Sequence, residues 1–124
     1  MRIFSFEAAT ARPLTAFGSA NASIAPLARP SGFVQLVCMR LEAGGVVGMH
    51  PATIPQLFLV VTGEGWVRAG TGERVPIRAG LAAFWEAGEE HESGTEAEAG
   101  MMAIVLEAAQ LDPAQVLREE MTAG

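Results

Sequence analysis

The sequence predicts one all-β domain of the barrel type. Its 14 glycines and 7 prolines, spread over 124 residues, cut the chain into segments that are too short for ordinary helices. Half of the residues are apolar and 18% are charged, so the chain has enough apolar material for one packed core and is not expected to be disordered. A chain of this length accommodates a single domain.

Six apolar segments between glycine-rich turns are predicted strands. They are residues 33–41, 56–61, 65–69, 74–77, 81–85 and 101–106. The separators have the composition of hairpin loops and lie at 43–45, 62–64, 70–72, 79–80 and 87–88. Segment 57–61 is apolar on both faces, which predicts an interior strand that is covered on each side.

The two ends of the chain lack this pattern. The N-terminal part mixes alanine, serine and proline without a period, and we expect an irregular arm with one or two short strands, one of them near residues 3–6. The expected division is an arm at 1–30, a barrel at 31–108, and a helix and tail at 109–124.

The C-terminal segment carries the signals of a helix start. Asp112 can serve as the N-cap, and Pro113 suits the first helical position. Val116 and Leu117 follow as apolar residues, so a short helix is predicted to run to about Met121.

The charge and the apolar runs exclude several classes of function. Thirteen glutamates and one aspartate against eight arginines give a net charge of −6, which opposes binding to nucleic acids and anionic membranes. The longest apolar runs are far shorter than the roughly 18 residues of a transmembrane helix. Glu7 and Arg12 interrupt the apolar stretch that a signal peptide requires, so we expect a cytoplasmic protein.

Cys38 is the only cysteine, so it has no internal disulfide partner. It alternates with Val34 and Leu36, and this spacing predicts a small side chain in the core.

The only two histidines, His50 and His91, lie in a repeated pattern of spacings. The first copy consists of Gly44, His50, Ala52, Gln56 and Gly63, and the second of Gly80, Glu86, Gly88, His91 and Thr95. The spacings resemble the two motifs of the cupin family, G-x5-H-x-H-x3,4-E-x6-G and G-x5-P-x-G-x2-H-x3-N. The resemblance covers about residues 34–106.

This resemblance implies a conical β-barrel, that is, a double-stranded β-helix or jelly roll, which is commonly a homodimer. The segments HPA, PQLFLVV and GEGWV are similar to those of small single-domain bacterial cupins without a settled activity. A homodimer is also expected from the apolar face formed by Leu57, Leu59 and Val61, because two-fold pairing is the commonest way to cover such a face.

The family's metal ligands are only partly present. In metal-binding cupins three histidines and one glutamate converge, and here His50 and His91 match the first and last histidine, whereas Ala52 and Gln56 replace the other two ligands. We therefore expect a weakly bound divalent metal (Fe, Mn, Ni or Zn) held by His50, Gln56 and His91. In the alternative, His50 and Gln56 hydrogen-bond each other beside a degenerate metal site.

Four glutamates flank His91 and leave a second alternative open. Glu86, Glu89, Glu90 or Glu92 can supply the missing carboxylate and complete a two-histidine, one-carboxylate iron site. A solvated acidic loop is the preferred interpretation, because runs of charge usually face water.

Aromatic and basic residues near the motifs are candidates for ligand binding. Phe58, Trp66, Phe84 and Trp85 can line a pocket or pack in the core or a dimer contact. Arg40 or Arg68 can bind a substrate carboxylate.

Three functional classes follow from these features. The first is a metal-dependent enzyme, such as a dioxygenase or isomerase, acting on a small organic substrate. The second is a metal-free protein that binds a small molecule in the barrel, and the third is a structural homodimer.

Overall fold

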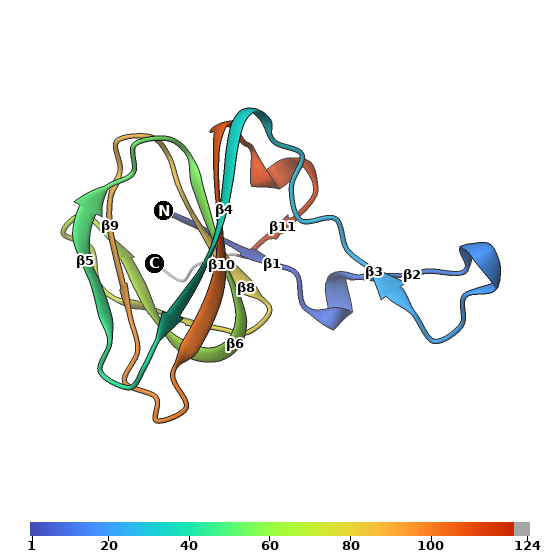
Figure 1. The fold of residues 1–124 in the computed structure, drawn as a ribbon, viewed down its shortest axis with the longest axis horizontal. Coiled ribbons are helices and arrows are strands. Elements are labelled where there is room, and N and C mark those ends of the chain that lie inside the picture. The colour runs from blue at the N-terminus through green and yellow to red at the C-terminus, as the bar shows by residue number, and fades with distance from the viewer. Residues whose placement is uncertain (121–124) are drawn as a thin grey trace.

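The computed structural model describes residues 1–120 and consists mainly of antiparallel strands (Figure 1). Within these residues, nine strands form one sheet system in which β11, β1, β8, β6, β10 and β4 are neighbours in that order, and β5, β7 and β9 complete it. A separate two-stranded hairpin joins β2 and β3. The strands are β1 Arg2–Ser5, β2 Arg12–Pro13, β3 Ser23–Ile24, β4 Ser31–Leu41, β5 Val46–Pro51, β6 Gln56–Ala69, β7 Val75–Arg78, β8 Leu81–Trp85, β9 Glu90–Gly94, β10 Met101–Gln110 and β11 Arg118–Glu119.

Strand β6 runs through both halves of the barrel. Its first part pairs with β8 and β10, and its second part pairs with β7 and β9. The prediction of two strands separated by a turn at 62–64 was therefore wrong. Gly63 has φ +79° and a Cβ there would collide with the carbonyl oxygen of Gly100, so this glycine bends the strand where it passes from one set of partners to the other.

The other four predicted strands of the barrel are confirmed as β4, β7, β8 and β10; β8 has the predicted ends, and the ends of the other three differ by one to four residues. Besides β11 in the C-terminal segment, two strands were not among the predicted ones, β5 and β9, and these two pair with each other. Strand β9 has the sequence EHESG, which is polar and acidic, so hydrophobic periodicity gave no signal for it.

Two apolar clusters cover the two faces of β6. Phe58, Val60 and their neighbours fill the barrel interior, whereas Leu57 and Leu59 belong to a cluster on the outer face of the sheet. Leu117, from the C-terminal segment, completes that outer cluster. The prediction of a strand covered on both sides is confirmed for residues 57–60, whereas Val61 is exposed (36%). The chain itself supplies the cover over Leu57 and Leu59, so these two side chains do not require a partner subunit.

The predicted C-terminal helix was wrong. The Asp112 carboxylate does accept a hydrogen bond from the Ala114 N–H (3.1 Å), but the helical turn is a 3₁₀ turn limited to Pro113–Gln115. Strand β11 follows and pairs with β1, because this pairing and the burial of Leu117 (7% exposed) stabilise an extended chain. Met121 lies outside the described residues.

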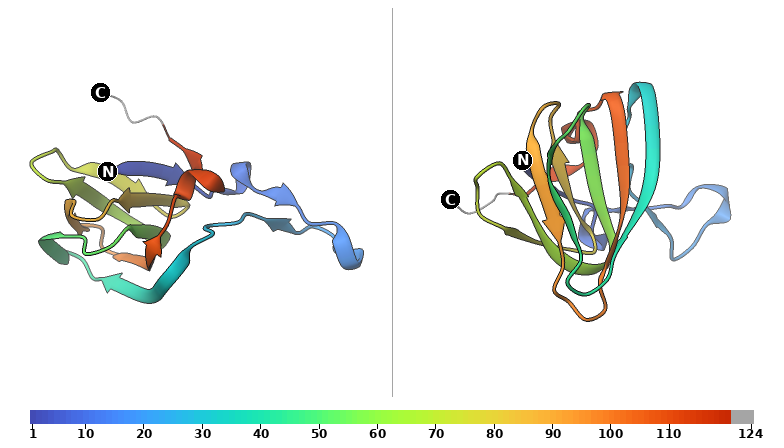
Figure 2. Two further views of the ribbon diagram at one scale, coloured as in Figure 1. Left: turned by 90° about the horizontal axis from the view of Figure 1, so that it is seen from above. Right: turned by 60° about the vertical axis from the view of Figure 1, so that its left-hand side comes forward.

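The arm and β4 are the least covered parts of the molecule. Residues 8–30 project from the barrel as a thin hairpin (Figures 1 and 2), and Phe17 near its tip is fully exposed. Strand β4 lies at the edge of the sheet, and Cys38 is exposed on it. The prediction of Cys38 as a core residue was wrong, because nothing in the described chain covers the outer face of β4.

No helix in the part of the chain that the structure describes has the length and apolar character needed to cross a membrane.

Candidate functional site

The barrel brings the two histidines into contact. Strands β5 and β9 pair with His50 opposite His91, and a register shift between Val47 and His50 precedes this pair. The centroids of the two imidazole rings lie 4.3 Å apart, with an angle of 55° between the ring planes. His50 and His91, which are 41 positions apart in the sequence, thus form one pair of adjacent imidazole rings.

The backbone fixes the orientation of both rings. Nδ1 of His50 lies 2.6 Å from the Gly48 carbonyl oxygen, and Nδ1 of His91 lies 3.1 Å from the Glu89 carbonyl oxygen. A carbonyl oxygen only accepts hydrogen bonds, so each neutral ring carries its proton on Nδ1. The Nε2 lone pairs of both histidines are then left to bind another group.

His91 is buried and His50 faces solvent. His91 is 3% exposed and stacks on Trp85, with ring centroids 4.3 Å apart and planes 25° apart. Burial lowers the pKa of the His91 imidazole; the hydrogen bond to the Glu89 carbonyl opposes this effect, and the neighbouring His50 adds to it. His91 is therefore a neutral imidazole at pH 7.

Trp85 brings an unpaired hydrogen-bond donor to this end of the barrel. Its side chain is fully buried, with Phe58 edge-on at 5.9 Å, and its indole Nε1 has no hydrogen-bond partner among the described residues. A buried N–H without an acceptor costs about 1–3 kcal/mol. The atom therefore marks a place where an acceptor from outside the chain would be stabilising.

Gln56 lies next to Trp85 in the sheet but is engaged elsewhere. Its Nε2 donates a hydrogen bond to a carboxylate oxygen of Glu107 on β10 (2.8 Å). Because the ring N–H of His50 donates to Gly48 and the amide of Gln56 to Glu107, the structure shows neither group in the predicted His50–Gln56 hydrogen bond. The amide oxygen of Gln56 remains as a neutral oxygen donor for a ligand.

Glu107 was not among the site residues predicted from the sequence. This residue shares the inward parity of Ala103 and Val105, and it is the one charge in the apolar run of β10. A lone carboxylate on the inward face of a strand was the signal that could have identified it.

The acidic stretch around His91 is largely engaged in structural contacts. The Glu89 carboxylate pairs with the amino group of Met1 and accepts a hydrogen bond from the Glu86 N–H (3.0 Å). Glu92 pairs with Arg68 at 2.8 Å, so the expectation of a solvated loop holds for Glu86 and Glu90 but was wrong for Glu89 and Glu92.

The described residues hold no group of three or more histidine, cysteine or acidic side chains placed to bind a metal. A replacement carboxylate beside the two histidines is therefore absent from that part of the chain.

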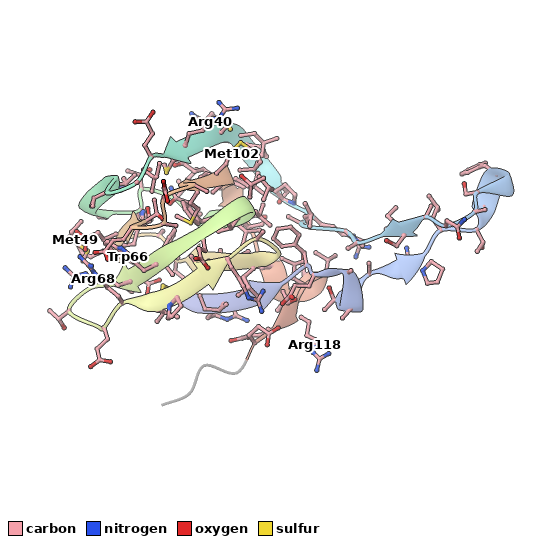
Figure 3. All side chains as sticks on the ribbon, turned by 90° about the horizontal axis from the view of Figure 1, so that it is seen from below. Arg40, Met49, Trp66, Arg68, Met102 and Arg118 are labelled. Carbon is pink, nitrogen blue, oxygen red and sulfur yellow. The ribbon has the colours of Figure 1, made fainter. Side chains whose placement is uncertain are left out.

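The aromatic and basic residues that were candidates for ligand binding do not lie together in one site. Phe58 and Trp85 face the barrel interior, whereas Phe84 belongs to the outer cluster. Trp66 lies under the Arg74 guanidinium, 3.8 Å from the ring centroid. Figure 3 places Trp66 and Arg68 at the end of the barrel away from the arm, and the carboxylate of Glu92 already engages Arg68.

No protein-family model matches the sequence, and neither does any curated protein. Solved structures do match. A predicted oxalate decarboxylase from Thermotoga maritima is 26% identical, with a TM-score of 0.54, over 64% of this chain and 65% of that one, which is slightly less than two thirds of its length.

Two further structures extend the likeness. An RmlC-like cupin family protein with a double-stranded β-helix fold from Methanocaldococcus jannaschii is 13% identical, with a TM-score of 0.58, over 69% of this chain and 74% of that one. An uncharacterised conserved protein with a double-stranded β-helix domain from Klebsiella pneumoniae is 18% identical, with a TM-score of 0.57, over 90% and 93% of the two chains. The antiparallel architecture and these likenesses agree: the chain is a small protein with the cupin-type double-stranded β-helix fold.

Proposed function

We propose that the protein binds a small organic molecule at the end of the barrel that carries His50, His91 and Trp85. The observation that carries this proposal is one cluster of three rings, in which two imidazole Nε2 atoms lie near an unpaired, buried indole N–H. Small-molecule sites in proteins combine apolar and aromatic walls with a few polar groups of this kind.

The polar groups define the chemistry of the ligand. The indole N–H needs an acceptor such as a carbonyl oxygen, and a neutral Nε2 accepts a hydrogen bond from an N–H or O–H. The Glu107 carboxylate lies one strand beyond Gln56, and a negative charge there disfavours an anion. The ligand that suits the site best is therefore uncharged and planar, and it carries both a hydrogen-bond donor and an acceptor. An amide, or another uncharged analogue of an acid, has these properties.

An ¹H–¹⁵N spectrum tests this proposal, because the chain has two tryptophans. Titration with benzamide is expected to shift the indole signal of Trp85 and to leave that of Trp66 unchanged. Toluene, which has no polar group, and benzoate, which is charged, are the comparison probes and are expected to bind more weakly. Trp85→Phe keeps the aromatic ring and removes the N–H, so it should weaken benzamide binding about tenfold. Equal shifts of both indole signals, or an unchanged affinity in Trp85→Phe, would refute the proposal.

A second candidate function is weak binding of a divalent metal by His50 and His91, with Gln56 as the third ligand. The observation in its favour is the pair of Nδ1–carbonyl hydrogen bonds, because metal-ligating histidines donate their other ring N–H in this way. Two imidazoles and a neutral amide oxygen fit a weakly held ion, which would act as a Lewis acid on a bound substrate. The ion's charge would stay uncompensated, so tight binding is not expected.

Thermal unfolding with added Zn²⁺, Ni²⁺, Mn²⁺ or Fe²⁺ tests this candidate. Metal at a hundredfold excess over Kd stabilises by about 2.7 kcal/mol, an effect that His50→Ala should abolish. If wild type and His50→Ala respond equally to every metal, the histidine pair is not a metal site.

We further propose that two copies of the chain associate through β4, as a homodimer. Four apolar side chains on this edge strand are strongly exposed, namely Phe33 (63%), Val34 (44%), Leu36 (64%) and Val37 (37%). The chain exposes 7239 Å², about 900 Å² more than the roughly 6300 Å² of a compact monomer of 13.0 kDa. The projecting arm contributes to this excess together with β4, and an ordinary stable interface buries roughly 800 Å² on each partner.

Light scattering measures this association directly. Leu36→Glu should convert the dimer to a monomer, whereas Val46→Glu, at an apolar and exposed position of β5 (53%), should not. A monomeric wild type at micromolar concentration would contradict the proposal.

A further inference from the structure

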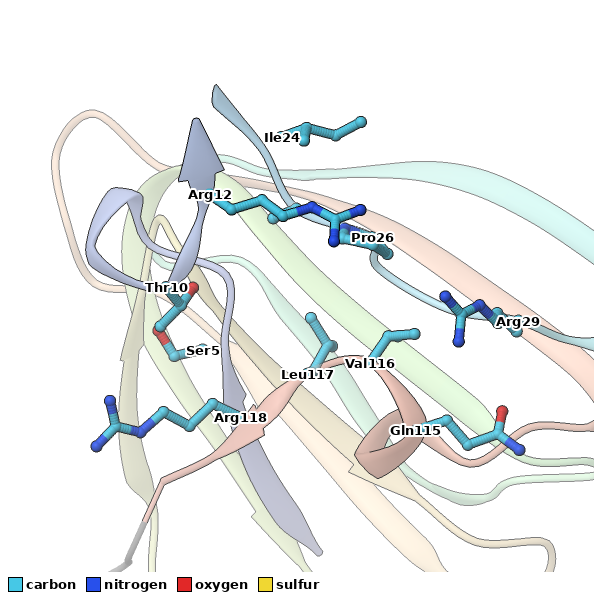
Figure 4. A pocket seen from close by; sticks show the side chains of 11 residues that line it. Ser5, Thr10, Arg12, Ile24, Pro26, Arg29, Gln115, Val116, Leu117 and Arg118 are labelled. Carbon is cyan, nitrogen blue, oxygen red and sulfur yellow. The ribbon is translucent and has the colours of Figure 1, made fainter. Parts of the chain in front are cut away.

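We propose that a second site, outside the barrel, binds a small organic anion with an apolar body. The site is a pocket of about 460 Å³ between the base of the arm and the C-terminal segment (Figure 4). Strand β1, the arm and residues 115–118 all contribute to its lining, so segments from the two ends of the chain create it together. This volume lies in the range of pockets that hold small metabolites.

The charge of the pocket is opposite to that of the protein. The chain has a net charge of −6 and only eight basic side chains, all arginines, and three of them line this pocket: Arg12, Arg29 and Arg118. No acidic side chain is among its lining residues. In a protein with an excess of acidic side chains, a cluster of arginines without a carboxylate indicates a site that attracts anions.

Four of the arginines outside the pocket differ from the three pocket arginines, because they form ion pairs. Arg2, Arg68, Arg74 and Arg78 each have a carboxylate within 4.0 Å. Among the described residues, none of the three pocket arginines has such a partner. Their guanidinium groups are left to bind an anion from outside the chain.

The arrangement of the side chains suits one amphipathic anion. In Figure 4 the guanidinium groups of Arg12 and Arg29 lie on the same side of the pocket, above Val116 and Leu117. Leu117 is 7% exposed and provides an apolar floor. Arg118 extends from the other side of the pocket, away from this pair.

One hydroxyl group, that of Ser5, adds a neutral donor at the opposite wall, whereas the Thr10 hydroxyl already donates to the Glu7 carbonyl oxygen (2.8 Å). Ser5 is buried (2% exposed), and its Oγ accepts a hydrogen bond from the Glu7 N–H (3.3 Å), so its own proton is available to a ligand. The guanidinium fork binds planar or tetrahedral oxyanions in a two-pronged manner, which makes a carboxylate or phosphate the matching group. The apolar floor then favours an aliphatic or aromatic body on that anion over a free inorganic ion.

Isothermal calorimetry at low salt tests the inference with octanoate and phenyl phosphate as probes. Inorganic phosphate, which lacks the apolar body, and octanol, which lacks the anionic group, are the comparison probes. We expect one-to-one binding of the first two, weaker binding of the others, and an affinity that falls with added salt. Arg12→Gln and Arg29→Gln should each weaken octanoate or phenyl phosphate binding about tenfold.

Arg40→Gln is the matched control, because Arg40 is also without a carboxylate partner in the described chain but lies on β4, away from the pocket. It should leave the affinity unchanged, and so should His91→Gln, which alters only the barrel site. An equal loss in Arg40→Gln would show nonspecific attraction to arginine, and binding that survives both pocket substitutions would overturn the proposal. The result for His91→Gln separates this site from the barrel site, so either can fail alone.

Discussion

Strands β6 and β4 are both long and apolar and lie on opposite sides of β10, yet they have opposite surroundings. Leu57 of β6 is fully buried, whereas Leu36 of β4 is 64% exposed, although both side chains lie opposite Leu106. The difference arises from the position in the sheet: β6 is interior and the C-terminal segment covers its outer face, whereas β4 is an edge. An apolar alternating segment thus predicts a strand, but the order of strands decides which face is buried.

Truncation of one leucine in each strand should give the largest difference. Leu57→Ala removes a fully buried side chain and is expected to lower the free energy of unfolding by about 2–5 kcal/mol. Leu36→Ala leaves no cavity in the monomer and should cost less than about 1 kcal/mol. Urea denaturation at low protein concentration, where a dimer would dissociate, measures both values. Equal losses would mean that the outer face of β4 is covered in the isolated chain.

Removal of the cover on β6 should make that strand more like β4. Leu117→Ala takes away an apolar side chain that packs against the outer cluster, and we expect a loss of about 2 kcal/mol, at the lower end of the range for buried leucines. Leu27→Ala on the arm, where the side chain is 38% exposed, is the control and should have little effect on the urea midpoint. A neutral Leu117→Ala would show that the C-terminal segment does not contribute to the stability of the sheet.

The same distinction explains which parts of the fold were predictable from the sequence. Glycine spacing and apolar segments predicted the barrel and the strands β4, β7, β8 and β10. Burial was harder, because Cys38 has the same local pattern as a core residue and its exposure depends on β4 being an edge. The predicted helix after Asp112 is absent for a related reason. The Asp112 cap is present, but pairing of β11 with β1 stabilises the extended chain more than helical propensity stabilises a helix.

The candidate site was predictable only in part. The repeated spacing identified His50 and His91, which the structure places in contact. The partner of Gln56 could not be found from motif spacing, because Glu107 lies on β10, beyond the second motif. The stacking of Trp85 on His91 and its unpaired N–H likewise depend on packing between strands that are distant in the sequence.

The smallest expected effect concerns the pH dependence of stability. His91 is buried and His50 is exposed, so the two histidines differ in burial as β6 and β4 do. Burial lowers the pKa of His91 in the folded protein below the value of about 6.5 in an unfolded chain. Between these two values the unfolded state binds a proton that the folded state does not, so stability rises with pH through this window. The contribution is fully present above about pH 6.5 and is lost as the pH falls toward the folded pKa.

Thermal unfolding between pH 5 and pH 7.5 measures this loss. Wild type should melt at a lower temperature as the pH is reduced, and His91→Gln, which has no imidazole to protonate, should show a smaller slope. His50→Gln should keep most of the wild-type slope, because His50 is exposed and acts on the His91 pKa only after burial and the Glu89 hydrogen bond. If wild type and His91→Gln have the same slope, protonation of His91 is not resisted by the fold. The stacked imidazole would then be open to water, and Trp85 would not isolate it from solvent. A ligand bound at the neutral Nε2 would make the wild-type slope steeper, since protonation of His91 would then also expel the ligand.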